Sequence, residues 1–119
     1  MEKRLYIVKQ RGPELLPIVS VSDGTKINAY LDGENLTYIF SKRRFAEDFL
    51  RMARFDGCSL LSPYVGDPRN YWIVCENPET DDRTIRRCRA GQNLTVCLRY
   101  EIRVFTSKKA AEDYVISKW

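Results

Sequence analysis

Histidine is absent from this 119-residue sequence. The absence excludes Ser-His and Cys-His catalytic pairs, imidazole metal ligands and an imidazole proton shuttle at neutral pH. The adjacent carboxylates Glu47-Asp48 and Glu112-Asp113 fall in predicted helices, where neighbouring side chains point about 100° apart and do not converge on one substrate. We therefore expect a protein that is not an enzyme and that uses no cofactor and no metal.

Glycine-rich phosphate loops and closely spaced cysteine pairs are also missing. The six glycines form neither GxGxxG nor GxxxxGK[ST]. The four cysteines, Cys58, Cys75, Cys88 and Cys97, include no closely spaced pair of the kind that zinc sites use. We expect them to be thiols in a reducing compartment, and mostly small buried side chains.

No long hydrophobic run occurs near the start of the chain. The apolar run Leu5–Val8 is flanked by charges and is too short for the core of a signal peptide or for a bilayer span. We expect a cytoplasmic protein without membrane association. With 44% apolar residues the chain should fold, and its length, residues 1–119, suits a single domain.

An internal repeat is the most informative feature that is present. Gly33–Thr37 (GENLT) resembles Gly91–Thr95 (GQNLT), and Ile39–Leu50 resembles Val104–Val115. The two pairs occur in the same order, and they exchange Ile with Val, Ser with Thr, Arg with Lys and Phe with Tyr. This pattern predicts an internal duplication. The predicted halves extend over residues of about 15–54 and 70–117.

Each half is predicted to form a three-stranded meander followed by a helix, a βββα unit. In the first half the runs Ile18–Val21, Lys26–Leu31 and Leu36–Phe40 are separated by turns that contain Asp-Gly, which favours hairpins. The N-terminal run Leu5–Lys9 adds another strand. In the second half Leu94–Phe105 alternates polar and apolar residues and predicts one long strand. The residues of that strand predicted to face the core are Val96, Leu98, Tyr100, Ile102 and Val104.

Two helices follow these strands, at Lys42–Arg54 and Ser107–Lys118. Ser41, and either Thr106 or Ser107, are the predicted N-caps. The apolar stripe of the first helix comprises Phe45, Phe49, Met52 and Ala53.

The fold class that these elements predict is α+β. Two amphipathic helices can cover only one face of a sheet, so we expect two layers, with a mostly antiparallel sheet whose other face is open. The open face is then the expected contact surface.

Cations at both predicted helix starts break a local preference. Lys42, Arg43 and Arg44 begin the first helix, and Lys108 and Lys109 begin the second. The helix dipole disfavours positive charge there, whereas the free N–H groups of a first turn attract anions. These residues are therefore candidates for an anion or nucleic-acid site, although ordinary solvated side chains would give the same pattern.

A second basic cluster lies in the segment Arg83–Arg89. Together with the arginines on the solvent-exposed face of the predicted long strand, it would form one continuous positive surface. Tyrosines near this surface could stack on nucleic-acid bases. The net charge of +4 and the interspersed acidic residues are modest for a nucleic-acid binder, so nucleic-acid or phosphate binding is the alternative hypothesis. The candidate residues of this cluster are Arg86, Arg87, Arg89, Arg99 and Arg103.

The leading hypothesis is a non-catalytic binding or protein-interaction module that acts on a protein partner or forms a homo-oligomer through the open sheet face. Seven Tyr, five Phe and two Trp exceed what one small core can hold, and surface aromatic residues favour interfaces. The candidate interface residues are Tyr38, Trp72 and Trp119. A less favoured hypothesis is a thiol-dependent enzyme, because the arginines around Cys88 would lower its pKa if the thiol is exposed.

Overall fold

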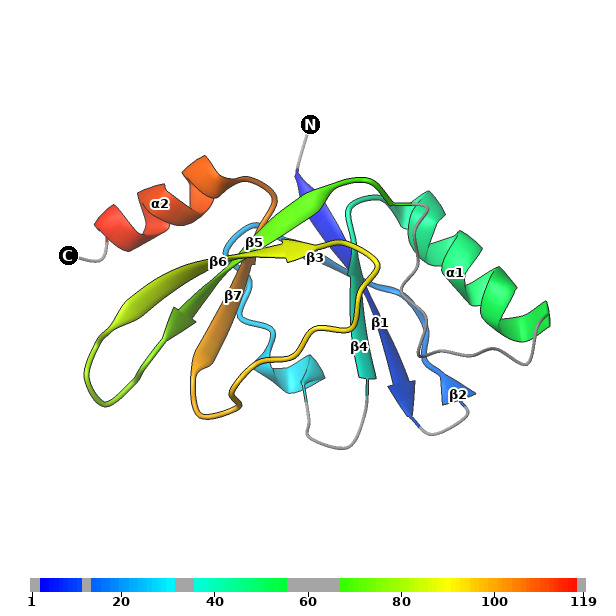
Figure 1. The fold of residues 1–119 in the computed structure, drawn as a ribbon, viewed down its shortest axis with the longest axis horizontal. Helices are drawn as coiled ribbons and strands as arrows, with labels where there is room; N and C mark the ends of the chain where they lie inside the picture. The colour runs from blue at the N-terminus through cyan, green and yellow to red at the C-terminus, as the bar shows by residue number, and fades with distance from the viewer. Residues whose placement is uncertain (1–2, 12–13, 32–35, 56–66, 118–119) are drawn as a thin grey trace.

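The protein has two antiparallel sheets and two helices, which confirms the α+β class. A computed structural model describes residues 3–11, 14–31, 36–55 and 67–117. The two helices lie at opposite ends of the molecule, and the strands lie between them (Figure 1). None of the helices among the described residues is long and apolar enough to cross a bilayer.

The first sheet is built around strand β1 (Arg4–Arg11). It pairs with β2 (Glu14–Leu15), β3 (Val19–Ser22) and β4 (Leu36–Phe40), in each case antiparallel. Helix α1 (Arg43–Phe55) packs on one face of this sheet.

The second sheet has β5 (Asn70–Glu76) at its centre. It pairs antiparallel with β6 (Arg83–Arg89) on one side and with β7 (Glu101–Phe105) on the other. Helix α2 (Lys108–Ser117) packs on one face, where Ala111 meets Val74 and Phe105.

The central strand of each sheet is apolar on both faces, and both faces are covered. Along β1, Leu5 and Ile7 belong to a core cluster that they share with residues of the second sheet, whereas Val8 belongs to the cluster under α1. Along β5, Ile73 joins the shared cluster and Val74 packs toward α2. Successive strand residues point to opposite faces, so each sheet packs on its helix with one face and on the other sheet with the other. The prediction of one sheet with an open face is therefore wrong.

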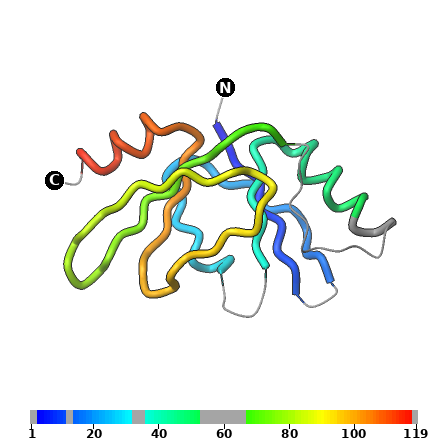
Figure 2. The backbone as a smooth tube through the Cα atoms, in the orientation of Figure 1, coloured from blue at the N-terminus to red at the C-terminus, as the bar shows by residue number. Residues whose placement is uncertain are grey.

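Each half also closes the edge of a strand in the other half. The N–H of Gly24 donates to the carbonyl of Val104 in β7 at 2.8 Å, and the N–H of Gly91 donates to the carbonyl of Ile39 in β4 at 2.9 Å. Both glycines have φ of 85°, a conformation that residues with a Cβ adopt only with strain. The backbone trace shows the segment after β6 running alongside β4 (Figure 2).

The predicted meander of the first half is wrong. β3 and β4 are not neighbours, because both pair with β1, and Leu5–Lys9 lies within that central strand. The run Lys26–Leu31 is not a strand: it bridges to Arg103 and then forms the 3₁₀ helix η1 (Asn28–Tyr30). The side chain of Ile27 is buried in the shared core. The apolar residues of this run therefore reflect burial of the segment and not a strand.

The predicted long strand from Leu94 to Phe105 is also wrong. Only Glu101–Phe105 is a strand, and the preceding residues follow an irregular path. Leu94 is buried at the crossing toward β4, whereas Leu98 and Tyr100 are 48% and 38% exposed instead of facing the core. The alternation of buried and exposed residues does not continue over the whole run. Its first residues contact β4 of the first sheet, and its last residues form β7 of the second sheet.

The helices begin and end close to the predicted residues. Phe49 is buried and Phe45 is partly buried, as the apolar stripe requires, but Met52 is 50% exposed and is not part of the core cluster under α1. Ala53 lies outside the residues whose side chains are described.

Candidate anion-binding site

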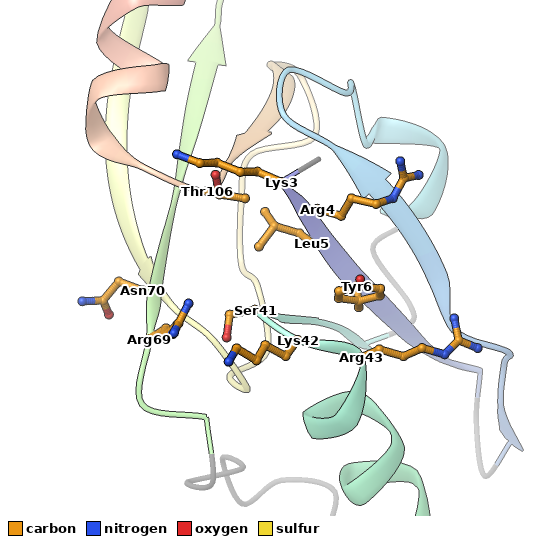
Figure 3. Close-up of a pocket in the computed structure, with 10 residues that line it drawn as sticks. All are labelled: Lys3, Arg4, Leu5, Tyr6, Ser41, Lys42, Arg43, Arg69, Asn70 and Thr106. Atoms are coloured by element: carbon orange, nitrogen blue, oxygen red, sulfur yellow. The ribbon is translucent and has the colours of Figure 1, made fainter. Parts of the chain in front are cut away.

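A cavity of about 550 Å³ opens between the two halves, beside the start of α1 and the end of β7 (Figure 3). The first half contributes residues from the start of β1 and from the start of α1. The second half contributes residues that precede or begin β5 and one residue that follows β7. The lining residues are Lys3, Arg4, Leu5, Tyr6, Ser41, Lys42, Arg43, Arg69, Asn70 and Thr106.

The lining is strongly cationic. Five of these residues are lysine or arginine, and none is aspartate or glutamate. Lys3, Lys42 and Arg69 form no ion pair with any residue that the structure describes. Arg43 pairs with Glu47 at 3.1 Å on the exposed surface of α1. A concave surface lined by charge of one sign focuses the field and attracts counter-ions.

The carboxylate of Asp67 fixes one side of the cavity. Asp67 is fully buried and accepts hydrogen bonds from the N–H and the hydroxyl of Ser41 at 2.7 and 2.8 Å. It also accepts one from the N–H of Arg69 at 3.2 Å. The carboxylate therefore ties the end of β4 to the segment that enters β5, and it holds Lys42 and Arg69 on the same rim.

Asp23 does the same on the opposite side. It accepts hydrogen bonds from the N–H and the hydroxyl of Thr106 at 2.8 and 3.0 Å. In both places a carboxylate of one half binds the residue that follows the last strand of the other half. Each carboxylate bonds to neutral donors, so neither forms an ion pair with the cavity cations within the described chain.

Ser41 is therefore not the N-cap that the sequence predicted. Its hydroxyl donates to Asp67, and the carbonyl of Lys42 accepts the first helical hydrogen bonds of α1. At α2 the hydroxyl of Ser107 accepts from the N–H of Ala110 at 3.2 Å, which is N-cap geometry.

The structure brings only some of the predicted helix-start cations into the cavity. Lys42 and Arg43 line it, whereas the guanidinium of Arg44 lies 4.9 Å from the ring centroid of Phe45 on the exposed surface. Lys108 and Lys109 are exposed at the start of α2 and are not among the lining residues.

Lys3, Arg4 and Arg69 line the cavity but were not predicted from the sequence. None belongs to a basic run at a helix start. Lys3 and Arg69 come together at the cavity only because one half packs against the other, and the guanidinium of Arg4 is held by Ser20 within the first half. No local pattern in the sequence carries that information.

The predicted basic stripe is separate from the cavity. Arg86, Arg87 and Arg89 line a small second cavity of about 110 Å³ on the second sheet, and Arg99 is exposed in the irregular segment before β7. Arg103 does not belong to a wet face. It is partly buried, donates to Glu76 at 3.1 Å and to the carbonyl of Gly24 at 2.9 Å, and so joins the two halves.

The predicted interface aromatics are largely internal. Tyr38 is 1% exposed and packs with its ring centroid 4.7 Å from that of Phe49, so its prediction as an interface residue is wrong. Trp72 is partly buried against the cluster under α2. Trp119 lies outside the described residues.

The cysteines give no sign of a reactive thiol at Cys88. Cys88 is buried, and burial raises the pKa of its thiol although Arg86 acts in the opposite direction. Burial also raises the pKa of Cys75. Within the described part of the chain no three Cys, Asp or Glu residues are grouped so as to hold a metal ion, and Cys58 lies outside it.

Comparisons with family models, with curated proteins and with solved structures find no match to this chain.

Proposed function

We propose that this protein is a non-catalytic binding module whose ligand carries a phosphate group, and that the cationic cavity between its two halves holds that group. The observation that carries the proposal is the lining itself: among the residues that the structure describes, five cations and no carboxylate surround about 550 Å³. A volume of this size lies within the range of about 300–1,000 Å³ usual for small-molecule sites.

The cations supply complementary donors of two kinds. Arg69 carries a planar guanidinium group that suits two oxygens of a phosphate, and Lys3 and Lys42 add compact ammonium groups. The guanidinium groups of Arg4 and Arg43 bond to Ser20 and Glu47 and add positive charge without direct donors. The first turn of α1 begins at the same rim, and its backbone N–H groups favour negative charge. Tyr6 lines the cavity beside these groups, which favours a nucleotide or a single-stranded nucleic acid over inorganic phosphate.

The test is a binding titration with three probes: inorganic pyrophosphate, a fluorescent mononucleotide and a labelled single-stranded DNA of eight nucleotides. We expect binding at low salt that weakens as salt is added, because counter-ions compete for the phosphate. Lys42→Ala and Arg69→Ala should each weaken binding by about threefold to tenfold, since each removes one charge-assisted contact. The relative affinities of the three probes tell which source of phosphate the cavity takes.

Lys108→Ala is the matched control. Lys108 is an exposed cation at the start of the other helix but does not line the cavity. Its loss should leave binding within about twofold, the size expected for a remote surface charge. Equal losses for Lys108→Ala and Lys42→Ala, or no binding of any probe at low salt, would contradict the proposal.

We also infer that the two halves arose by duplication of one unit. The crossing hydrogen bonds of Gly24 and Gly91 support this, since each lies at the same φ and donates to the last strand of the other half. Further support comes from a second matched pair: Ile27 donates to the carbonyl of Ile102, and Leu94 donates to the carbonyl of Thr37. On this inference Gly91 corresponds to Gly24. This correspondence replaces the sequence-based alignment of Gly91–Thr95 with Gly33–Thr37.

A further inference from the structure

Strand β6 is the longest strand with only one neighbour among the described residues. It has seven residues, and it pairs with β5 alone. The outer edges of β4 and β7 are closed by the crossing segments, and β2 and β3 have only two and four residues. Within the described ranges, the edge of β6 therefore presents the longest row of unpaired backbone groups.

The register identifies the residues on that free edge. The N–H of Ala90 donates to the carbonyl of Arg69 at 3.1 Å, so the backbone of Ala90 points toward the segment that enters β5. In an antiparallel ladder, successive residues of a strand point their N–H and C=O groups alternately to its two edges. With the register that pairs Tyr71 with Cys88, the even-numbered residues of β6 bond to β5. The residues whose N–H and C=O groups point outward are then Arg83, Ile85, Arg87 and Arg89.

The same edge is cationic. Arg87 and Arg89 are exposed and form no ion pair with the described residues, and Arg83 is held by Glu76 at 3.3 Å. Arg86 is exposed on the opposite face and donates to the carbonyl of Thr95 at 2.8 Å. Pairing of β6 with the same strand of a second copy would place one cationic strand against another, which is unfavourable. An acidic strand would meet complementary charge.

We propose that β6 binds an acidic, extended segment of another protein by strand addition. The segment lies antiparallel or parallel along β6, exchanges backbone hydrogen bonds with Ile85, Arg87 and Arg89, and places carboxylates beside Arg87 and Arg89. A nucleic acid would satisfy the charges but cannot add a strand, because it lacks the repeating N–H and C=O groups. The backbone row and the charge together thus select a peptide.

The first experiment measures binding of three end-blocked, fluorescent ten-residue peptides. The first peptide alternates Glu and Val, and the second alternates Lys and Val. The third has the Glu-Val sequence but carries N-methyl groups on the backbone nitrogens that would face β6. We expect only the first to bind. The N-methyl peptide keeps every carboxylate, so equal binding of the first and third peptides would overturn strand addition.

The second experiment compares Arg87→Ala with Arg87→Pro. Alanine removes the charge, and we expect it to weaken peptide binding by about twofold to threefold, as for an exposed ion pair. Proline also removes an outward N–H, and we expect a further loss of about fivefold, the size of one hydrogen bond. Proline is tolerated where the N–H of an edge strand faces solvent, so the ladder with β5 should persist. Arg43→Ala, which alters the anion cavity, is the control and should bind the peptide normally.

A third measurement covers the case in which Arg87→Pro does not fold. In the unmodified protein, peptide binding should slow hydrogen exchange of the Ile85, Arg87 and Arg89 amides, whereas the Arg86 and Cys88 amides are already bonded to β5. Unchanged exchange at the odd-numbered residues would refute the proposal. Displacement of the peptide by single-stranded RNA, with identical losses in Arg87→Ala and Arg87→Pro, would identify the surface as a nucleic-acid patch instead.

Discussion

Asp67→Ala should destabilise the protein more than any other single loss of a carboxylate in the described chain. The carboxylate is fully buried and accepts three hydrogen bonds, two from Ser41 and one from the Arg69 N–H. Alanine leaves the N–H of the partly buried Ser41 without its protein partner. An unsatisfied buried donor costs about 1–3 kcal/mol, and hydrogen bonds to a charged group contribute about 1.5–3 kcal/mol each without being additive.

The gain from no longer burying a charge opposes these losses. Because three short contacts are removed at once, we expect a net loss of about 3 kcal/mol in the free energy of unfolding. Urea unfolding followed by circular dichroism measures it, as a lower midpoint with an unchanged slope. Asp82→Ala is the control: Asp82 is exposed, and its loss should change the stability by less than about 0.5 kcal/mol.

The same variant should lose phosphate binding, because Asp67 holds the rim that carries Lys42 and Arg69. Ligand binding is measured below the unfolding transition, where the variant is still folded. If the free energy of unfolding of Asp67→Ala lies within about 1 kcal/mol of that of the original protein, the reasoning that this carboxylate joins the two halves is refuted.

Three further predictions follow from other contacts. Gly24→Ala should cost about 1–2 kcal/mol in urea unfolding because φ is 85°, although the new Cβ would lie 3.8 Å from the nearest atom, in the Phe105 ring, and would not clash. Burial raises the pKa of Glu76, but hydrogen bonds from Tyr114 and Arg103 outweigh it, and the net shift is downward. A carboxyl with a lowered folded-state pKa adds stability above its unfolded pKa that is lost as the pH falls through the folded pKa. Tyr114→Phe should therefore destabilise the protein by about 1 kcal/mol at pH 7 and by progressively less below about pH 4; a difference that does not vary with pH would contradict this. Iodoacetamide at neutral pH should modify exposed Cys97 before buried Cys88, as read by peptide mass mapping, and the reverse order would show that the Cys88 thiol is accessible.

Local patterns predicted the helices well because helix formation depends on neighbours along the chain. The stripe of Phe45 and Phe49 and the repeated basic starts place α1 and α2 almost where the structure has them. The strands were harder to predict. In the run Lys26–Leu31, Ile27 is buried in the core between the two sheets, and Tyr30 and Leu31 pack against that core. These apolar residues give the same sequence signal as a strand, although the segment crosses from one sheet to the other.

Only those residues of the candidate site that follow a local sequence pattern were predicted. Lys42 and Arg43 were visible because they break a helix-start preference, and they do line the cavity. Arg69 and Lys3 break no local rule. Their role depends on Asp67 reaching Ser41 from the other half, a contact between residues far apart in sequence.

The crossing segments make the cavity a property of the whole chain. Gly24 and Gly91 each complete a sheet edge in the other half, and Asp23 and Asp67 each fix a strand end there. A half expressed alone would expose the edge of β4 or β7 and one face of its sheet, so we expect it to aggregate or remain unfolded. The cations on the two sides of the cavity converge only through these crossings. Any ligand held between them would therefore contact both halves at once, and its binding should stabilise the folded chain against urea by an amount that rises with the logarithm of the free ligand concentration once that concentration exceeds Kd.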